Sequence, residues 1–316
     1  MDHYFEPMRL ILLILFVVQP ALNTQLRLEK ILNVPSVAFS MNGDGVLSYG
    51  IFEANLQLTC RSQTPNGEII FADNSRASLY LAQTSDSTVF RIAENGKMHL
   101  YTRVLNSWVS KELSLIIKPN EYSVGLIKPA EFNRRSGFLI VMDNVINFYS
   151  FKDLRLEPLP LSTHLNSAEQ IVGIDYMDGR LAVALEEEKE QLRSYKVLVW
   201  DAITGKIENV YKGEQTDFIT YEPVLSFRNH RELFISYSYA KDDSRLILLD
   251  FVEKKVVAED KLLALNVLNI VSDRRGFDVV TVINESRNEI KIPSNIMDAF
   301  DNSFKNIETY RVFYDN

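Results

Sequence analysis

The stretch EQIVGIDYMDGRLAVALEEEKEQLRSYKVLVWDAITGKIENVYKG, residues 169–213, decides the fold class of this chain. It contains four short apolar runs, which are separated by a tight Asp178-Gly179 turn, a charged loop at Glu186–Glu190 and the tetrad Ala202-Ile203-Thr204-Gly205. Alternating apolar runs of about 4 to 8 residues, bounded by turn residues, are typical of β-strands. The stretch therefore predicts one four-stranded antiparallel sheet.

Weaker copies of this unit precede and follow it along the chain. The residue equivalent to Trp200, in the third run of each copy, recurs at intervals of 41 to 51 residues. The equivalent positions are Leu58, Tyr101, Tyr149, Trp200, Leu249 and Ile290. A period of about 40 to 50 residues with four strands per repeat is the signature of a β-propeller. We therefore predict an all-β propeller of six four-stranded blades, and seven blades if two thin repeats are counted as one.

The stretch also resembles a blade of the WD-repeat family. Ile171–Ala184 is similar to the first hairpin of such a blade, and Val197–Asp201 with the following Thr204-Gly205-Lys206 is similar to its third strand and turn. Leu249-Asp250 keeps the aspartate in the next repeat. The resemblance implies a ring architecture and a structural, hydrogen-bonding role for Asp201 and Asp250. No Gly-His pair precedes a repeat and only one repeat has Trp-Asp, so the resemblance is to the fold and implies no activity.

Ring closure and one helix complete the predicted architecture. A strand from one terminus must complete the blade that the other terminus begins, because an unpaired edge invites aggregation. Residues 25–31 or 307–314 can supply that strand. Pro293-Ser294 begins the one short C-terminal helix that we expect, because Ile296, Met297, Phe300 and Phe304 follow at helical spacing. We interpret this apolar stripe as core packing.

The first 24 residues have the features of a secretory signal peptide. Arg9 precedes the nine-residue apolar run Leu10–Val18, and Pro20 and a short region at 21–24 follow. This pattern predicts a cleaved signal, and the run is short for a bilayer span of about 20 residues. We expect a secreted or secretory-lumen protein in which residues 25–316 form a single propeller domain without a membrane span. A retained signal anchor is the alternative.

The composition and a few single residues indicate which partners and which covalent modifications we expect. The net charge of −8 lacks the basic footprint that nucleic-acid binding needs. Cys60, the only cysteine, lies in an apolar run, which predicts a buried thiol and no internal disulfide. Asn284-Glu285-Ser286 is the only N-glycosylation acceptor after residue 24. We therefore predict glycosylation at Asn284.

The sequence contains none of the common catalytic or phosphate-binding motifs, such as Gly-x-Ser-x-Gly or His-Glu-x-x-His. His99, His164 and His230 lie far apart, and we interpret them as ordinary surface or core residues. Asn42–Gly45 and Asp242-Asp243 carry oxygen ligands that calcium can use, but turn formation explains them better. We therefore expect no catalytic residue, no cofactor and no metal site.

The longer connections are the expected binding surface, because loops on a rigid scaffold carry function. They are Lys128–Ser136, Pro160–Ala168 and Glu186–Arg193. In the last, Glu186, Glu187, Glu188 and Glu190 form a candidate interaction loop for a basic protein partner, with a merely solvated loop as the alternative.

We therefore predict a non-catalytic protein-binding module with an unidentified protein partner. One alternative is a six-bladed metal-dependent hydrolase of the lactonase or esterase kind, which requires inward-pointing Asp, Glu, Asn or His side chains from several blades. The other is a small-ligand carrier that uses the central channel. Aromatic side chains facing the axis favour the carrier, and a channel filled by charged residues opposes it.

Overall fold

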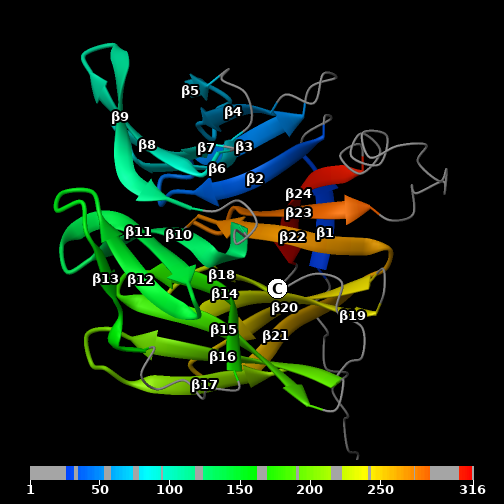
Figure 1. The fold of residues 1–316 in the computed structure, drawn as a ribbon. Helices are drawn as coiled ribbons and strands as arrows, with labels where there is room; N and C mark the ends of the chain where they lie inside the picture. Colours follow the sequence, from blue (N-terminus) through cyan, green and yellow to red (C-terminus); the bar gives the residue numbers. More distant parts are fainter. Residues whose placement is uncertain are drawn as a thin grey trace, which may run out of the picture.

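The chain folds into a ring of six sheets around a central channel (Figure 1). A computed structural model describes residues 26–31, 35–52, 58–73, 78–93, 95–117, 124–161, 169–189, 192–214, 223–240, 243–273, 275–284 and 306–314. The predicted signal peptide and the predicted helix at 293–304 lie outside these residues. Each sheet has four antiparallel strands, which confirms the predicted six-bladed β-propeller and, at the level of the fold, its resemblance to WD-repeat propellers.

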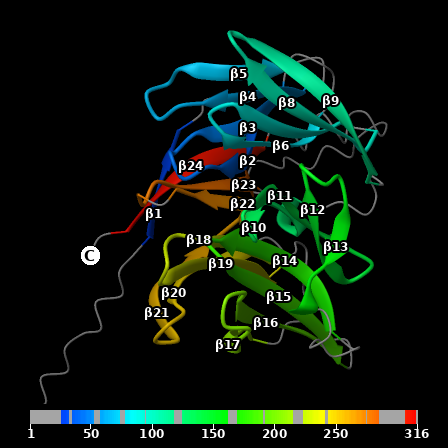
Figure 2. The ribbon, with the colours of Figure 1, turned by 90° about the vertical axis from the view of Figure 1, so that its left-hand side faces the viewer.

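The first strand of each blade lies nearest the axis, as Figure 2 shows from the face that carries the turns after these strands. The first strands are β2 (Ser36–Met41), β6 (Ser78–Ser85), β10 (Ile127–Phe132), β14 (Glu169–Met177), β18 (Val224–Phe227) and β22 (Leu265–Ser272). The second strands are β3 (Leu47–Phe52), β7 (Thr88–Ala93), β11 (Arg135–Met142), β15 (Arg180–Lys189), β19 (Glu232–Ala240) and β23 (Asp278–Asn284).

The third strands are β4 (Leu58–Gln63), β8 (Lys97–Val104), β12 (Val145–Ser150), β16 (Leu192–Asp201), β20 (Asp243–Asp250) and β24 (Ile307–Tyr314). The outermost strands are β5 (Ile69–Asp73), β9 (Ser107–Ile116), β13 (Leu156–Pro158), β17 (Ile207–Lys212), β21 (Lys255–Leu262) and β1 (Leu26–Lys30). Blades 1 to 5 follow the chain from β2 to β21, and blade 6 combines β22–β24 with β1. A 3-10 turn, Val124–Leu126, precedes β10.

The predicted repeat positions fall on equivalent strands. Leu58, Tyr101, Tyr149, Trp200 and Leu249 lie in the third strands of blades 1 to 5. The sixth position, Ile290, lies outside the described residues, and the third strand of blade 6 is β24 instead. The two termini therefore both contribute to blade 6: β24 lies third and β1 closes the sheet.

Two predicted loops are wrong, because their residues belong to strands. The acidic residues Glu186, Glu187 and Glu188 continue β15 and pair with β16, while Glu190 lies outside the described residues. Arg193 stabilises this extension, with its Nε atom 3.2 Å from Glu186 Oε1 and 3.4 Å from Glu188 Oε2. The predicted loop at Lys128–Ser136 consists of most of β10, a two-residue turn and the start of β11.

Side chains in the turns fix the WD-like geometry of blades 4 and 5. Asp178 and Gly179 have positive φ angles of 47° and 84°, as a type I′ hairpin turn requires. Asp201 Oδ1 accepts hydrogen bonds from Ile203 N at 2.9 Å and Thr204 N at 3.0 Å. Asp250 makes the equivalent bonds to two amides of its own turn. The predicted structural role of both aspartates is thus confirmed.

Replacing Asp201 by alanine should lower the free energy of unfolding by about 0.5 to 2 kcal/mol, because a side chain that satisfies two turn amides acts like a helix N-cap. Asp201→Asn retains an acceptor oxygen and should therefore lower the free energy of unfolding by less. Urea unfolding of both variants measures the difference. Equal losses for alanine and asparagine would show that the hydrogen bonds to the turn are not the cause.

The ring is closed by pairing between β1 and β24, which run side by side in Figures 1 and 2. Lys30 Nζ lies 2.9 Å from Glu308 Oε1 across this pair. Glu308 also accepts hydrogen bonds from Tyr310 and from Asn284 Nδ2. Burial opposes ionisation of Glu308, but these hydrogen bonds outweigh it and lower its pKa to about 2.

Acid should weaken this closure. Because the pKa of Glu308 is lower in the folded than in the unfolded chain, its contribution to stability is present above about pH 4.5 and is lost as the pH falls towards 2. We expect a loss of about 1 to 2 kcal/mol, moderated by the partial exposure of Lys30. Urea unfolding at pH 3 and pH 6 should show a smaller difference for Glu308→Gln than for the natural chain. An identical pH dependence of the two proteins would contradict this role.

The core lies between the blades. Phe90 of blade 2 stacks on Phe138 of blade 3 with ring centroids 4.5 Å apart, and Phe138 stacks on Tyr149 at 5.1 Å. Cys60 is completely buried, as predicted. Near the axis, side chains bond to the backbone of the next blade: Asn269 Nδ2 donates to Ala38 O at 2.8 Å. These contacts connect adjacent blades around the channel.

Candidate functional site

A cavity of about 930 Å³ occupies the channel and is lined by all six first strands. These strands run in the same direction, so the turns that follow them gather at one end of the channel. We call this end the channel mouth and define it by Asn42, Arg134, Asp178 and Ile203, all of which line the cavity. The ring thus brings together residues that are up to 161 positions apart, as Asn42 and Ile203 are.

A buried ion pair lies inside the channel between blades 3 and 4. Lys128 Nζ of β10 is 3.6 Å from Asp175 Oδ1 of β14, and the two side chains are 7% and 14% exposed. Asp175 Oδ2 accepts a hydrogen bond of 2.6 Å from the backbone amide of Phe227 on blade 5. Burial raises the pKa of Asp175, while Lys128 and the Phe227 amide oppose this shift. The pair therefore adds no net charge to the channel lining.

The other four first strands each place a polar residue along the cavity. They are Ser40, Gln83, Ser226 and Ser272. Ser40 Oγ donates to the Leu81 carbonyl at 3.1 Å and joins blades 1 and 2. Gln83 is only 2% exposed, and its amide oxygen and nitrogen have no hydrogen-bond partner among the described residues. A buried amide without partners normally binds water or a ligand group.

Four aromatic residues from four different blades belong to the cavity lining: Phe39, Phe132, Tyr176 and Phe227. The rings of Phe39 and Phe227 are buried in the cores between blades, at 3% and 4% exposure. Tyr176 is held in place because its hydroxyl donates to the Glu131 carbonyl at 2.6 Å and accepts from the Gly179 amide at 3.1 Å. Apolar walls with a few convergent polar groups are the usual composition of a binding site. The ion pair in the channel opposes a purely hydrophobic ligand.

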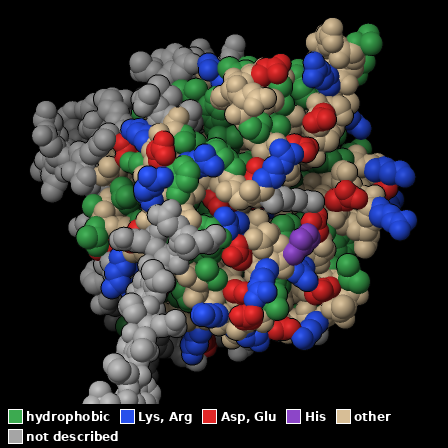
Figure 3. Space-filling model, turned by 180° about the vertical axis from the view of Figure 1, so that it is seen from behind, with side chains coloured by type: hydrophobic (Ala, Val, Ile, Leu, Met, Phe, Trp, Pro, Cys, Tyr) green, Lys and Arg blue, Asp and Glu red, His purple; other side chains and the backbone are tan. Residues whose placement is uncertain are grey.

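The mouth combines an exposed apolar side chain with charged groups. Ile203, in the turn that Asp201 holds, is 86% exposed. Arg180 of blade 4 donates to the His230 carbonyl of blade 5 at 2.5 Å, and His230 Nε2 is 3.6 Å from Asp178 Oδ2. These contacts join two blades at the rim. On the side of the molecule seen in Figure 3, acidic and basic side chains are interspersed.

The predicted interaction residues do not lie at this mouth. Glu186, Glu187 and Glu188 lie at the end of β15 that is remote from the Asp178-Gly179 turn, and therefore on the opposite face of the ring. Their predicted interaction with a basic partner stays a prediction. Asn284 ends β23, where its Nδ2 atom donates to Glu308 Oε2 at 3.0 Å, so a glycan there must be accommodated beside the closing strand.

The remaining candidate residues form no common site. His99 lies on β8 and His230 in the turn after β18, while His164 and Asp242 lie outside the described residues. Asn42 Oδ1 accepts from the amides of Asp44 and Val46, which confirms its interpretation as a turn residue. Within the described ranges, no three His, Cys, Asp or Glu side chains are arranged to hold a metal ion. No helix in these ranges is long and apolar enough to cross a bilayer.

The sequence matches no known family and no curated protein. Solved structures share its fold. SapL1 lectin, solved with alpha methyl fucoside, is 10% identical with a TM-score of 0.49, over 79% of this chain and 89% of the lectin. The Nup133 β-propeller domain of Vanderwaltozyma polyspora is 8% identical with a TM-score of 0.48, over 89% and 83%. Sqt1 of Saccharomyces cerevisiae is 9% identical with a TM-score of 0.46, over 83% and 84%. At these values the similarity carries no conclusion about this chain.

Proposed function

We propose that this chain is a protein-binding module of the secretory pathway, without catalytic activity, and that a partner protein binds across the channel mouth. The observation that carries the proposal is the mouth itself, where exposed Ile203 adjoins a cavity lined by aromatic and polar side chains from six blades. An exposed apolar side chain beside a concave site is suited to protein contact. The signal-like N-terminus supports the compartment.

A small polar ligand in the channel is a second candidate. Two observations favour it: the Gln83 amide has no partner in the described structure, and the Lys128 ammonium is buried beside Asp175 at 3.6 Å. The two candidates are compatible, because a partner protein can also insert a polar side chain into the channel.

Site-specific photocrosslinking tests the proposed function. A photoreactive phenylalanine analogue is placed at Ile203 in one protein and at Leu263 in another, and both are expressed in secreting cells. Leu263 is the matched control, because it is 69% exposed and lies in the turn before β22, on the opposite face. We expect a crosslinked secretory protein with position 203 only. The same products at both positions, or none at position 203, would contradict binding at the mouth.

A further inference from the structure

The hairpin of β8 and β9 differs from the other blade edges. β9 has 10 residues, whereas the other outermost strands have 3 to 8. Figures 1 and 2 show the hairpin extending beyond the body of the ring, at the perimeter of blade 2. Its turn, Leu105-Asn106, lies at the far end, and Leu105 is 92% exposed. The hairpin is therefore accessible from several directions.

Exposed apolar side chains concentrate on this hairpin and the neighbouring β5. Half of the ten large hydrophobic side chains exposed in the described structure lie here: Ile69, Val104, Leu105, Val109 and Ile116. Val104 and Val109 share one face of the hairpin, with Leu105 in its turn, whereas Ile69 lies on β5, on the side that Trp108 faces. Apolar groups gathered on one surface element mark an interaction site more often than scattered ones do.

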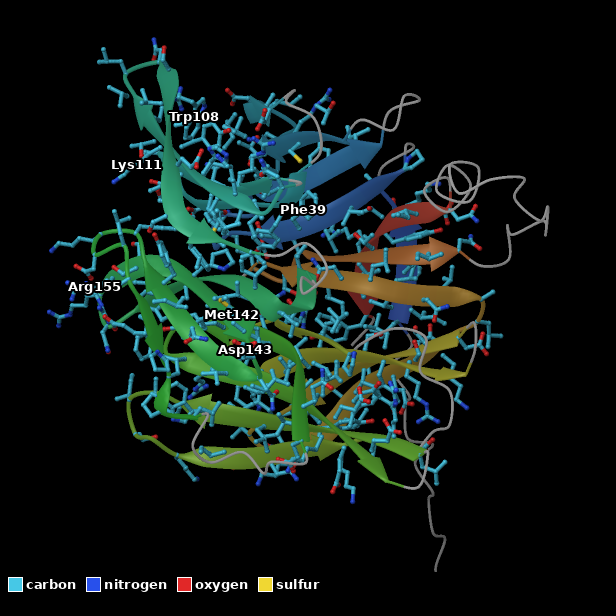
Figure 4. All side chains as sticks on the ribbon, viewed as in Figure 1. Phe39, Trp108, Lys111, Met142, Asp143 and Arg155 are labelled. Carbon is cyan, nitrogen blue, oxygen red and sulfur yellow. The ribbon has the colours of Figure 1, made fainter. Side chains whose placement is uncertain are left out.

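Trp108 anchors the hairpin against blade 1. Its Nε1 atom donates to the Ile70 carbonyl at 3.2 Å, and its ring meets Phe71 edge-on with centroids 5.2 Å apart. Because side chains alternate along a strand, Val109 faces the opposite side of the sheet from Trp108. Figure 4 labels Trp108 and Lys111 on this hairpin. The hairpin is thus held firmly while Val109 and Lys111 stay accessible.

The charge of the hairpin opposes that of the chain. Residues 97–116 contain Lys97, Arg103 and Lys111 but only one acid, Glu112, whereas the whole chain has a net charge of −8. Glu112 pairs with Lys97 at 3.0 Å. No described carboxylate forms an ion pair with Arg103 or Lys111. Lys111 shares the face of Val109, whereas Arg103 pairs with Trp108 and shares its face, so one positive charge without an ion-pair partner lies beside Val109.

The outer edge of β9 has no strand beside it among the described residues. An open edge offers a row of backbone donors and acceptors that an extended peptide can bind by adding a strand. Val109 and Lys111 are two positions apart on β9 and therefore face the same side of the sheet. We propose that β9 is the docking edge for an extended segment of a partner protein that carries an apolar residue and, two positions away, an Asp or Glu. The segment adds to blade 2 as a fifth strand, with its acid near Lys111 and its apolar side chain on Val109.

The same charge selects against other occupants. A basic or uncharged strand leaves Lys111 without a counter-charge, and lysine at an edge discourages such pairing. This surface lies at the perimeter of blade 2, so it goes beyond the proposed binding at the axis and is tested separately from it.

A selection from a phage-displayed library of random 12-residue peptides tests the inference on the purified protein. We expect enriched peptides in which an apolar residue and an acidic residue are two positions apart. Val109→Asp and Lys111→Glu should each weaken their binding at least about 10-fold, as substitutions at an interface centre do. Val256→Asp is the matched control, because Val256 is an exposed valine on β21, the outermost strand of blade 5, and it should leave binding unchanged.

Two readouts distinguish strand addition from other binding. Hydrogen exchange should show that a bound peptide protects amides within Ser107–Ile116, and peptides with Lys in place of their acids should bind Lys111→Glu better than the natural chain. Protection elsewhere, helical bound peptides, peptides without the acidic pattern, or failure to enrich any peptide would overturn the proposal. A dimer that forms through the hairpin would overturn it in favour of a second copy.

Discussion

Replacing Phe138 by alanine should lower the free energy of unfolding by about 3 to 5 kcal/mol, the range for a buried phenylalanine. Phe138 is completely buried on β11 and stacks on both Phe90 and Tyr149, so it joins blade 3 to blade 2. Its removal leaves a cavity between two blades that their backbones cannot close, because both are held by neighbouring sheets. Urea unfolding followed by circular dichroism measures the loss.

A matched substitution on the surface distinguishes the loss of buried packing from the mere removal of an apolar side chain. Leu105→Ala removes an apolar side chain that is 92% exposed and should change the stability by less than about 0.5 kcal/mol. The loss of stability for Phe138→Leu should fall between the losses for Leu105→Ala and Phe138→Ala. A loss of less than about 1 kcal/mol for Phe138→Ala would mean that the contact between blades 2 and 3 is not built as described.

Replacing Asp175 by alanine should lower the free energy of unfolding by about 2 to 3 kcal/mol. Loss of one partner of a fully buried ion pair costs about 3 to 5 kcal/mol, and water in the adjoining channel reduces this cost. The substitution leaves the Lys128 ammonium buried without its counter-charge and the Phe227 amide without its acceptor. Thermal and urea unfolding should both detect the loss.

The double variant Lys128→Met/Asp175→Leu is the control for this prediction. It removes both charges at once, and replacement of an ion pair by apolar side chains is often neutral for stability. The double variant should therefore be more stable than Asp175→Ala alone. If it is equally unstable or less stable, the penalty does not come from an uncompensated charge on Lys128.

The sequence predicts the blades best where turn chemistry and strand alternation agree. In blade 4 the Asp178-Gly179 turn separates two alternating runs, and Asp201 begins a turn that satisfies its own amides. The acidic extension of β15 was missed because glutamates have low strand propensity. Pairing with β16 and the ion pairs of Arg193 outweigh that propensity. In blade 6 the run at 289–292, which is nearer to β23 in the sequence, was predicted as the third strand. Distance along the chain does not determine which segment pairs, and it is β24 that pairs with β23.

The candidate site was less predictable than the fold. Lys128 and Asp175 are 47 residues apart, and only the closed ring brings their two strands together at the axis. The sequence did contain one indication of the site, because the first strand of each repeat carries a polar residue, such as Gln83. First strands line the channel of a propeller, so these residues indicate a polar channel. In blade 3 the predicted connection Lys128–Ser136 placed Lys128 in a loop and concealed the pattern.

The affinity of the partner captured at position 203 tests the central claim, binding across the channel mouth, most directly. A titration of the purified partner would compare the natural chain with Ile203→Asp and with Leu263→Asp on the opposite face. We expect Ile203→Asp to weaken binding at least about 10-fold, the effect of placing a charge at an interface centre, and Leu263→Asp to leave it unchanged. Unchanged binding by Ile203→Asp, or equal losses for both variants, would contradict the claim.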